Sequence, residues 1–148
     1  MRKLLLALCL LVALAGKVQA QGAQILYSTN ITGTVTITGP DVSYSLSQHS
    51  LAVVVNVTSI TGTTPTITPV VQFKDIPTGQ YIQWHAAFTA ISTAGTTTYL
   101  FCSGCGAAAG GITAVAAFPY PGVTWRLVLT YGGTVTATAG TATVYGLP

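Results

Sequence analysis

The residues best suited to chemistry in this chain are a pair of cysteines, two histidines and two aspartates. Cys102 and Cys105 are separated by two residues, a spacing shared by structural disulfides, redox dithiols and half of a zinc site. A zinc site needs four ligands, and neither His49 nor His85 lies at ligand spacing from the pair. A redox dithiol belongs at the start of a helix, and no helical pattern follows Cys105. We therefore predict a Cys102–Cys105 disulfide, with the redox and metal interpretations as alternatives.

The histidines and aspartates do not match a catalytic motif. The chain has two carboxylate side chains, Asp41 and Asp75, and it lacks the Gly-x-Ser-x-Gly turn that presents a nucleophilic serine. Asp41 follows Pro40 and Asp75 precedes Ile76-Pro77, so we interpret both as turn residues that hydrogen-bond nearby backbone. We expect no enzymatic activity, no cofactor and no metal ion. His85 remains a candidate ligand-binding residue.

Aromatic side chains provide the other candidate contacts. Tyr99, Tyr120 and Tyr145 are expected near loops or on outward faces of strands, where their rings can stack on sugars. Trp84 and Trp125 fall on the apolar faces of their segments, so we expect core packing for both. The three tyrosines, together with the histidine named above, predict a surface for carbohydrate or another ligand.

The elements that must position these residues are strands, because apolar residues alternate with threonine and other polar residues along most of the chain. The rows expected to face inward are Ile31, Val35 and Ile37; Val42; Leu51, Val53, Val55 and Val57; Ile67, Val71 and Phe73; Ile82, Trp84 and Phe88; and Trp125, Leu127, Leu129 and Tyr131. Segments 61–65 and 132–133 hold glycine or proline and are expected to be turns. Pro69 lies inside a run, which predicts an edge or bulged strand there.

This pattern predicts an all-β fold with scarcely any helix. About eight short strands separated by Gly/Pro turns indicate a two-sheet antiparallel sandwich, jelly-roll or immunoglobulin-like, with a closed barrel as the alternative. Residues 94–122 are rich in glycine and alanine, and we interpret them as a strand or two followed by a long surface loop. Such loops on rigid scaffolds commonly carry binding sites.

The first twenty residues have the features of a secretory signal peptide: a basic start, an apolar run from Leu4 to Ala15 and small residues before Gln21. We expect cleavage near Ala20, a single domain over residues 21–148, and a secreted, periplasmic or cell-surface location. An oxidising location favours the disulfide. No later segment has the roughly 20 unbroken apolar residues of a transmembrane helix, so we expect no stable membrane span.

Charge is nearly absent from the predicted mature chain. The 148 residues include five Lys and Arg and two Asp, and three of the basic residues lie in the leader. A chain with so few cations lacks the basic surface that binds a phosphate backbone, which excludes nucleic acid as a partner. Near-zero net charge favours a surface that is covered by other proteins or by copies of itself. Asn30 and Asn56 each begin a glycosylation sequon, which matters only in a eukaryotic host.

Two segments resemble a known family. Residues 55–72 have an alternating strand, a turn with Gly62 and Pro65, and a second strand ending in Val-Gln. Residues 125–138 have an arginine before an alternating run and a Gly-Gly-Thr turn. This arrangement is similar to small β-sandwich structural proteins of tailed bacteriophages and prophages. The resemblance spans about residues 52–144 and implies a virion accessory or decoration role without a catalytic residue, while the leader points to a host-encoded, exported relative.

The sequence thus predicts an exported, non-enzymatic structural or surface-assembly protein. Its partners would be copies of itself or other surface or virion proteins. The alternative is a secreted module that binds carbohydrate or another surface ligand through the aromatic residues.

Overall fold

The structure of this chain is a computed structural model that describes residues 22–43, 50–83, 88–102, 112–115 and 124–147. These residues form eight strands: β1 (Gln24–Thr32), β2 (Ile37–Thr38), β3 (Val42–Ser43), β4 (Ser50–Lys74), β5 (Tyr81–Gln83), β6 (Gly95–Cys102), β7 (Ile112–Val115) and β8 (Thr124–Leu147). Among the described residues there is no helix, and hence none that is long and apolar enough to cross a membrane. The all-β prediction is confirmed. The predicted leader, residues 1–20, lies outside the described residues.

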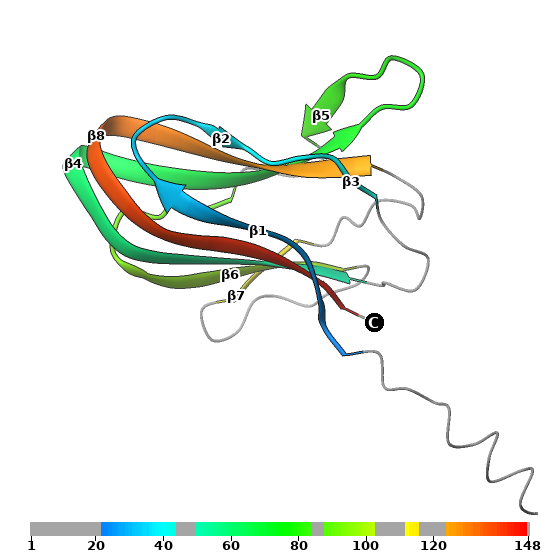
Figure 1. The fold of residues 1–148 in the computed structure, drawn as a ribbon, viewed down its shortest axis with the longest axis horizontal. Coiled ribbons are helices and arrows are strands. Elements are labelled where there is room, and N and C mark those ends of the chain that lie inside the picture. Colours follow the sequence, from blue (N-terminus) through cyan, green and yellow to red (C-terminus); the bar gives the residue numbers. More distant parts are fainter. Residues whose placement is uncertain (1–21, 44–49, 84–87, 103–111, 116–123, 148) are drawn as a thin grey trace, which may run out of the picture.

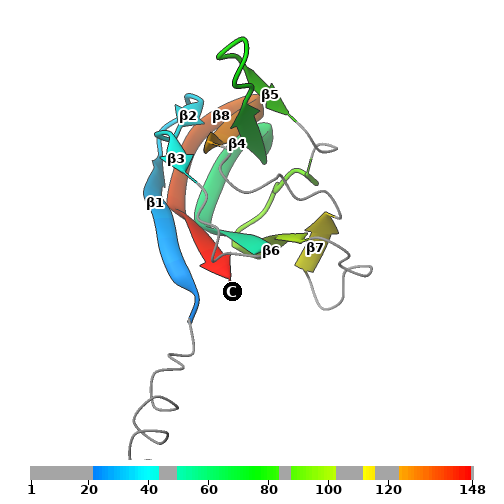
Figure 2. The ribbon, with the colours of Figure 1, turned by 90° about the vertical axis from the view of Figure 1, so that its right-hand side faces the viewer.

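The strands belong to one sheet with the order β1-β8-β4-β6-β7, to which β2 and β3 add on β8 and β5 adds on β4. Every pair is antiparallel except β6 with β7, which is parallel. β4 and β8 are 25 and 24 residues long, and they curve together so that each runs through both layers of the molecule (Figures 1 and 2). The predicted division into two sheets is therefore replaced, in the described residues, by a single curled sheet.

The curl lies where the sequence predicted turns. β4 and β8 remain paired on both sides of segment 61–65, but their register shifts between Val57 and Ser59 and twice more before Thr66. Gly133 has a φ of +67°, and a Cβ on it would lie 2.1 Å from the carbonyl oxygen of Thr64. Only glycine allows the two backbones to approach so closely. The glycines therefore bend two long strands instead of ending four short ones, as bulges and glycine kinks do in strongly curved sheets.

The hydrophobic core fills the space between the two layers. The predicted inward row Leu51, Val53, Val55 and Val57 is buried, and so are Ile67, Val71, Phe73, Trp125, Leu127 and Leu129. The two halves of β4 thus face each other across the core, because the strand doubles back at its bend (Figure 1). Phe88 joins them, with its ring 4.2 Å from that of Tyr99 and 5.0 Å from that of Phe101. These inward predictions are confirmed.

Two predicted inward residues lie on the surface. Val35 is 71% exposed because β1 ends at Thr32 and Gly33, with a φ of +88°, begins a turn. Ile82 is 45% exposed on β5, a strand of three residues that covers only the end of β4. Both errors come from extending a period of two through a segment that is not one continuous strand.

The observed pairing agrees with the prediction that Pro69 lies on an edge or bulged strand. Ile67 exchanges two backbone hydrogen bonds with Ile91, at 2.9 and 2.8 Å, on the side of β4 away from β8. Residues two apart direct their backbone groups to the same side, so the nitrogen of Pro69 also faces away from β8. Its missing donor therefore costs no bond in the β4–β8 pair.

Candidate functional site

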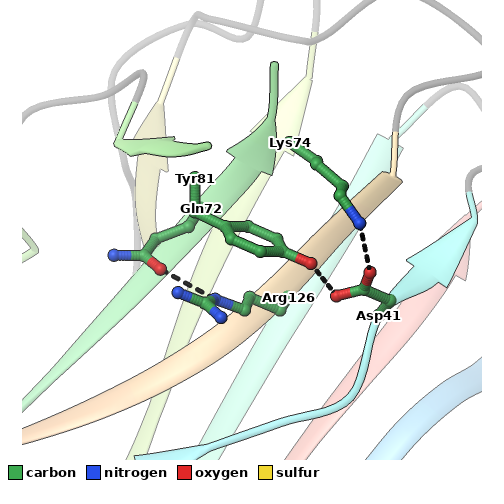
Figure 3. Close-up of polar contacts among 5 residues, drawn as sticks. All are labelled: Asp41, Gln72, Lys74, Tyr81 and Arg126. Atoms are coloured by element: carbon green, nitrogen blue, oxygen red, sulfur yellow. Dashed lines mark hydrogen bonds and ion pairs between the residues drawn. The ribbon is translucent and has the colours of Figure 1, made fainter. Parts of the chain in front are cut away.

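Five of the described polar side chains come together on the outer surface of the sheet, in a group that we call the polar cluster (Figure 3). Its members are Asp41, Gln72, Lys74, Tyr81 and Arg126. The cluster crosses four neighbouring segments, because Asp41 directly precedes β3, Arg126 lies on β8, Gln72 and Lys74 lie on β4, and Tyr81 begins β5.

Strand register and alternation bring these residues to one face. Gln72 lies directly opposite Arg126, and Lys74 lies directly opposite Tyr81. Phe73, between the two β4 members of the cluster, points into the core and is 5% exposed. Directly opposite side chains in antiparallel strands have Cβ atoms about 5 Å apart, so contact between them is expected. The pairing of β4 with β8 and with β5 therefore assembles four of the five members of the cluster.

One ion pair, two further hydrogen bonds and two cation–π contacts hold the cluster together. Lys74 Nζ lies 3.2 Å from Asp41 Oδ2, and the hydroxyl of Tyr81 donates a hydrogen bond to Asp41 Oδ1. The guanidinium carbon of Arg126 lies 3.5 Å from the centre of the Tyr81 ring, and Lys74 Nζ lies 5.6 Å from it. Arg126 Nε donates to Gln72 Oε1 at 2.9 Å. The contacts tie the segment before β3 to the β4–β5 hairpin.

Three ionisable groups of the cluster, Asp41, Lys74 and Tyr81, have pKa values shifted away from neutral pH. The hydrogen bond from Tyr81 has the largest effect and lowers the pKa of Asp41; desolvation raises this pKa, and the nearby Lys74 and Arg126 lower it. The same contacts with Asp41 raise the pKa values of Lys74 and Tyr81. The Asp41 contribution to stability is thus lost as the pH falls through its lowered pKa, and the Lys74 and Tyr81 contributions are lost as the pH rises through their raised pKa values. None is suited to proton transfer near pH 7.

The two aspartates differ in their surroundings. Asp75 is a turn residue, as predicted: its Oδ2 accepts hydrogen bonds from the backbone nitrogen of Thr78 at 3.1 Å and from Thr78 Oγ1 at 2.5 Å. The same interpretation is wrong for Asp41, whose carboxylate bonds to Lys74 and Tyr81 from distant parts of the chain. Local turn chemistry was readable from the sequence, whereas a contact that spans 33 or 40 residues was not.

The predicted outward position of Tyr99 is wrong. Its side chain is fully buried, packs against Phe88, and donates a hydrogen bond from its hydroxyl to the carbonyl oxygen of Thr89 at 2.9 Å. Tyr99 lies on β6 opposite Val53, so it shares the inward face of that pair. It belongs to the core and is not available for ligand stacking.

Burial of Tyr99 predicts a loss of stability at alkaline pH. Burial raises the pKa of its phenol to about 12, so the folded chain holds this proton more tightly than the unfolded chain. The Tyr99 contribution to stability is therefore complete below pH 10 and falls by roughly 2 kcal/mol between pH 10 and pH 12. Urea unfolding across this range should show the fall, and Tyr99→Phe should remove most of it. A fall in Tyr99→Phe as large as that of the native protein would contradict the assignment.

The other predicted site residues are not brought together in the described residues. Tyr145 lies on β8, half-buried and opposite Ala52. Cys102 ends β6, while Cys105, His49, His85 and Tyr120 lie outside the described residues, so the disulfide and these ligand contacts stay predictions. Asn30 is exposed on β1, and Asn56 is exposed on β4, where its Oδ1 accepts a hydrogen bond from Thr96 Oγ1 at 3.2 Å.

The polar cluster was missed at the sequence level although a signal existed. The described residues contain four charged side chains, and three of them, Asp41, Lys74 and Arg126, meet in the cluster. Their concentration in a nearly uncharged chain marks this face as distinct from the rest of the surface.

No family model, curated protein or solved structure matches the chain.

Proposed function

We propose that this chain is an exported, non-enzymatic structural protein that assembles through its own surface, as virion accessory or decoration proteins do. The observation that carries the proposal is the scarcity of unpaired charge. Asp41 is paired with Lys74, and Asp75 accepts hydrogen bonds within its own turn. Little like-charge repulsion is left to keep copies apart in solution.

The ionisable groups of the polar cluster support a non-catalytic role. The pKa of Asp41 is lowered and those of Lys74 and Tyr81 are raised, so all three keep one protonation state around neutral pH. General acid–base catalysis requires a group that gains and loses a proton near the working pH. The contacts suit a clamp that holds the β4–β5 hairpin against the sheet.

The test is the physical state of the protein recovered after export. Electron microscopy and light scattering should show discrete oligomers or ordered assemblies that grow with protein concentration. N-terminal sequencing of the same material should begin near Gln21. Particles that stay monomeric at the highest attainable concentration would contradict the assembly proposal, and an intact leader on soluble protein would contradict the proposed export.

A second candidate function is carbohydrate binding, which the planar groups of the polar cluster favour. Arg126 and Gln72 present flat hydrogen-bonding groups beside the ring of Tyr81, a combination typical of sites for polar ligands. On a polysaccharide panel, Arg126→Ala should weaken binding roughly tenfold, because a charge-assisted hydrogen bond would be lost. Tyr145→Ala serves as the control outside the cluster. Loss of binding with Tyr145→Ala alone would move the site away from the cluster, and no binding by the native protein would reject this function.

A further inference from the structure

Among the described strands, β1 is the longest one that lies at an edge of the sheet over its whole length. It has nine residues, ends the strand order, and pairs with β8 along one side. The other edge strands are short. β2 and β3 have two residues each, β5 has three and β7 has four. Short edge strands offer few backbone groups to another chain, so β1 is the edge where pairing would gain most.

The sequence of β1 lacks the usual protection of an edge. Residues Gln24–Thr32 include no lysine, arginine, aspartate, glutamate or proline. One bulge lies between Ile25 and Tyr27, and from Tyr27 to Thr32 the pairing with β8 is regular. Ile25 is 60% exposed, which makes it one of the few large apolar side chains on the described surface. Natural proteins usually place charge or proline on such an edge to prevent pairing between chains.

We propose that β1 pairs antiparallel with β1 of a second copy, which joins the two sheets about a two-fold axis. This inference rests on the proposed function and names the surface through which assembly begins. A strand of nine residues can be matched in full, among the described edges, only by another β1. Because the same surface is used by both copies, the contact closes on itself and forms a dimer instead of an open fibre.

Electrostatics do not oppose this pairing. Uncharged side chains such as Ser28 and Asn30 are exposed along β1, so no like charges meet across the proposed interface. The charged residues of the polar cluster lie on β4, on β8 and just before β3, outside β1. Backbone hydrogen bonds would provide most of the attraction, as in other complexes formed by strand addition.

The decisive experiment places charge on β1 and compares it with matched charge elsewhere. The test variant is Ile25→Lys with Asn30→Lys, and both positions are exposed on β1. The control is Ile76→Lys with Asn56→Lys, which makes the same two exchanges at exposed positions in the β4–β5 turn and on the central strand β4. Sedimentation of the exported protein should show a dimer Kd weakened about tenfold or more in the test variant, with the control near the native value.

Each outcome separates this inference from the proposed function. Equal weakening in both variants would assign the effect to net charge and overturn the role of β1. Assembly that survives the test variant unchanged would leave self-assembly standing and reject the β1 interface. A native protein that stays monomeric would reject both. Hydrogen exchange gives a second readout. The backbone amides of β1 that face away from β8 should become protected as the dimer forms, and unchanged exchange there would also reject the interface.

Discussion

Gly133→Ala is expected to lower the free energy of unfolding by about 3 kcal/mol. Gly133 lies in the left-handed region, with a φ of +67°, where an L-residue costs about 1 kcal/mol. The added Cβ would also lie 2.1 Å from the carbonyl oxygen of Thr64 and 2.8 Å from that of Thr63. Forcing apart two packed backbones adds about 2 kcal/mol. Chemical unfolding at one fixed protein concentration measures the difference.

Gly79→Ala is the matched control for this collision. Gly79 has a φ of +69°, almost equal to that of Gly133, but a Cβ on it would meet nothing within 4 Å. Its substitution should therefore cost only about 1 kcal/mol. If both variants lost the same stability, the close approach of β4 and β8 at the bend would be wrong.

Trp125→Ala is expected to be more damaging, at about 4 kcal/mol, since it empties the largest fully buried site in the described core. Trp125 lies on β8 between Val42 on β3 and Phe73 on β4. Its removal leaves a cavity beneath the polar cluster. Thermal unfolding of the exported protein, at fixed concentration, measures this loss.

Trp125→Phe separates the volume of the side chain from its polar group. In the described part of the chain, Trp125 Nε1 is buried and has no hydrogen-bond acceptor. A buried donor without a partner costs about 1 to 3 kcal/mol. Phenylalanine lacks this donor but keeps most of the packing of the aromatic ring. We therefore expect Trp125→Phe to cost about 1 kcal/mol or less. A loss as large as that of Trp125→Ala would show that the indole N–H makes a bond essential to the fold.

Alternation of apolar and polar residues predicted the inner face of the sheet well. Leu51, Val53 and Val55 are buried as expected, because a strand with one face in the core must place alternate residues there. The same rule could not predict what happens at Gly62 and Gly133. A glycine beside threonine residues allows either a reversal or a bend, and the choice depends on whether the partner strand continues alongside. Here it does, so one curled sheet forms.

The contacts within the polar cluster could not be predicted from the sequence for a similar reason. Gln72 and Lys74 were correctly expected to point away from the core, because they alternate with Val71 and Phe73. The sequence does not show which residues they contact, because Asp41 is brought to Lys74 by the pairing of four segments. The error for Tyr99 has another cause. Its neighbours suggested a loop, but pairing with Val53 fixed its side chain on the buried face.

The central claim is that this protein assembles with copies of itself through contacts that do not depend on charge. Sedimentation equilibrium of the exported protein, over a wide range of concentrations and at both low salt and about 1 M NaCl, tests it most directly. We expect an average mass that rises with concentration and changes little with salt, because the described residues include only four charged side chains and two of them, Asp41 and Lys74, are paired within each copy. A mass equal to one chain under all conditions, or assembly that disappears at high salt, would contradict it.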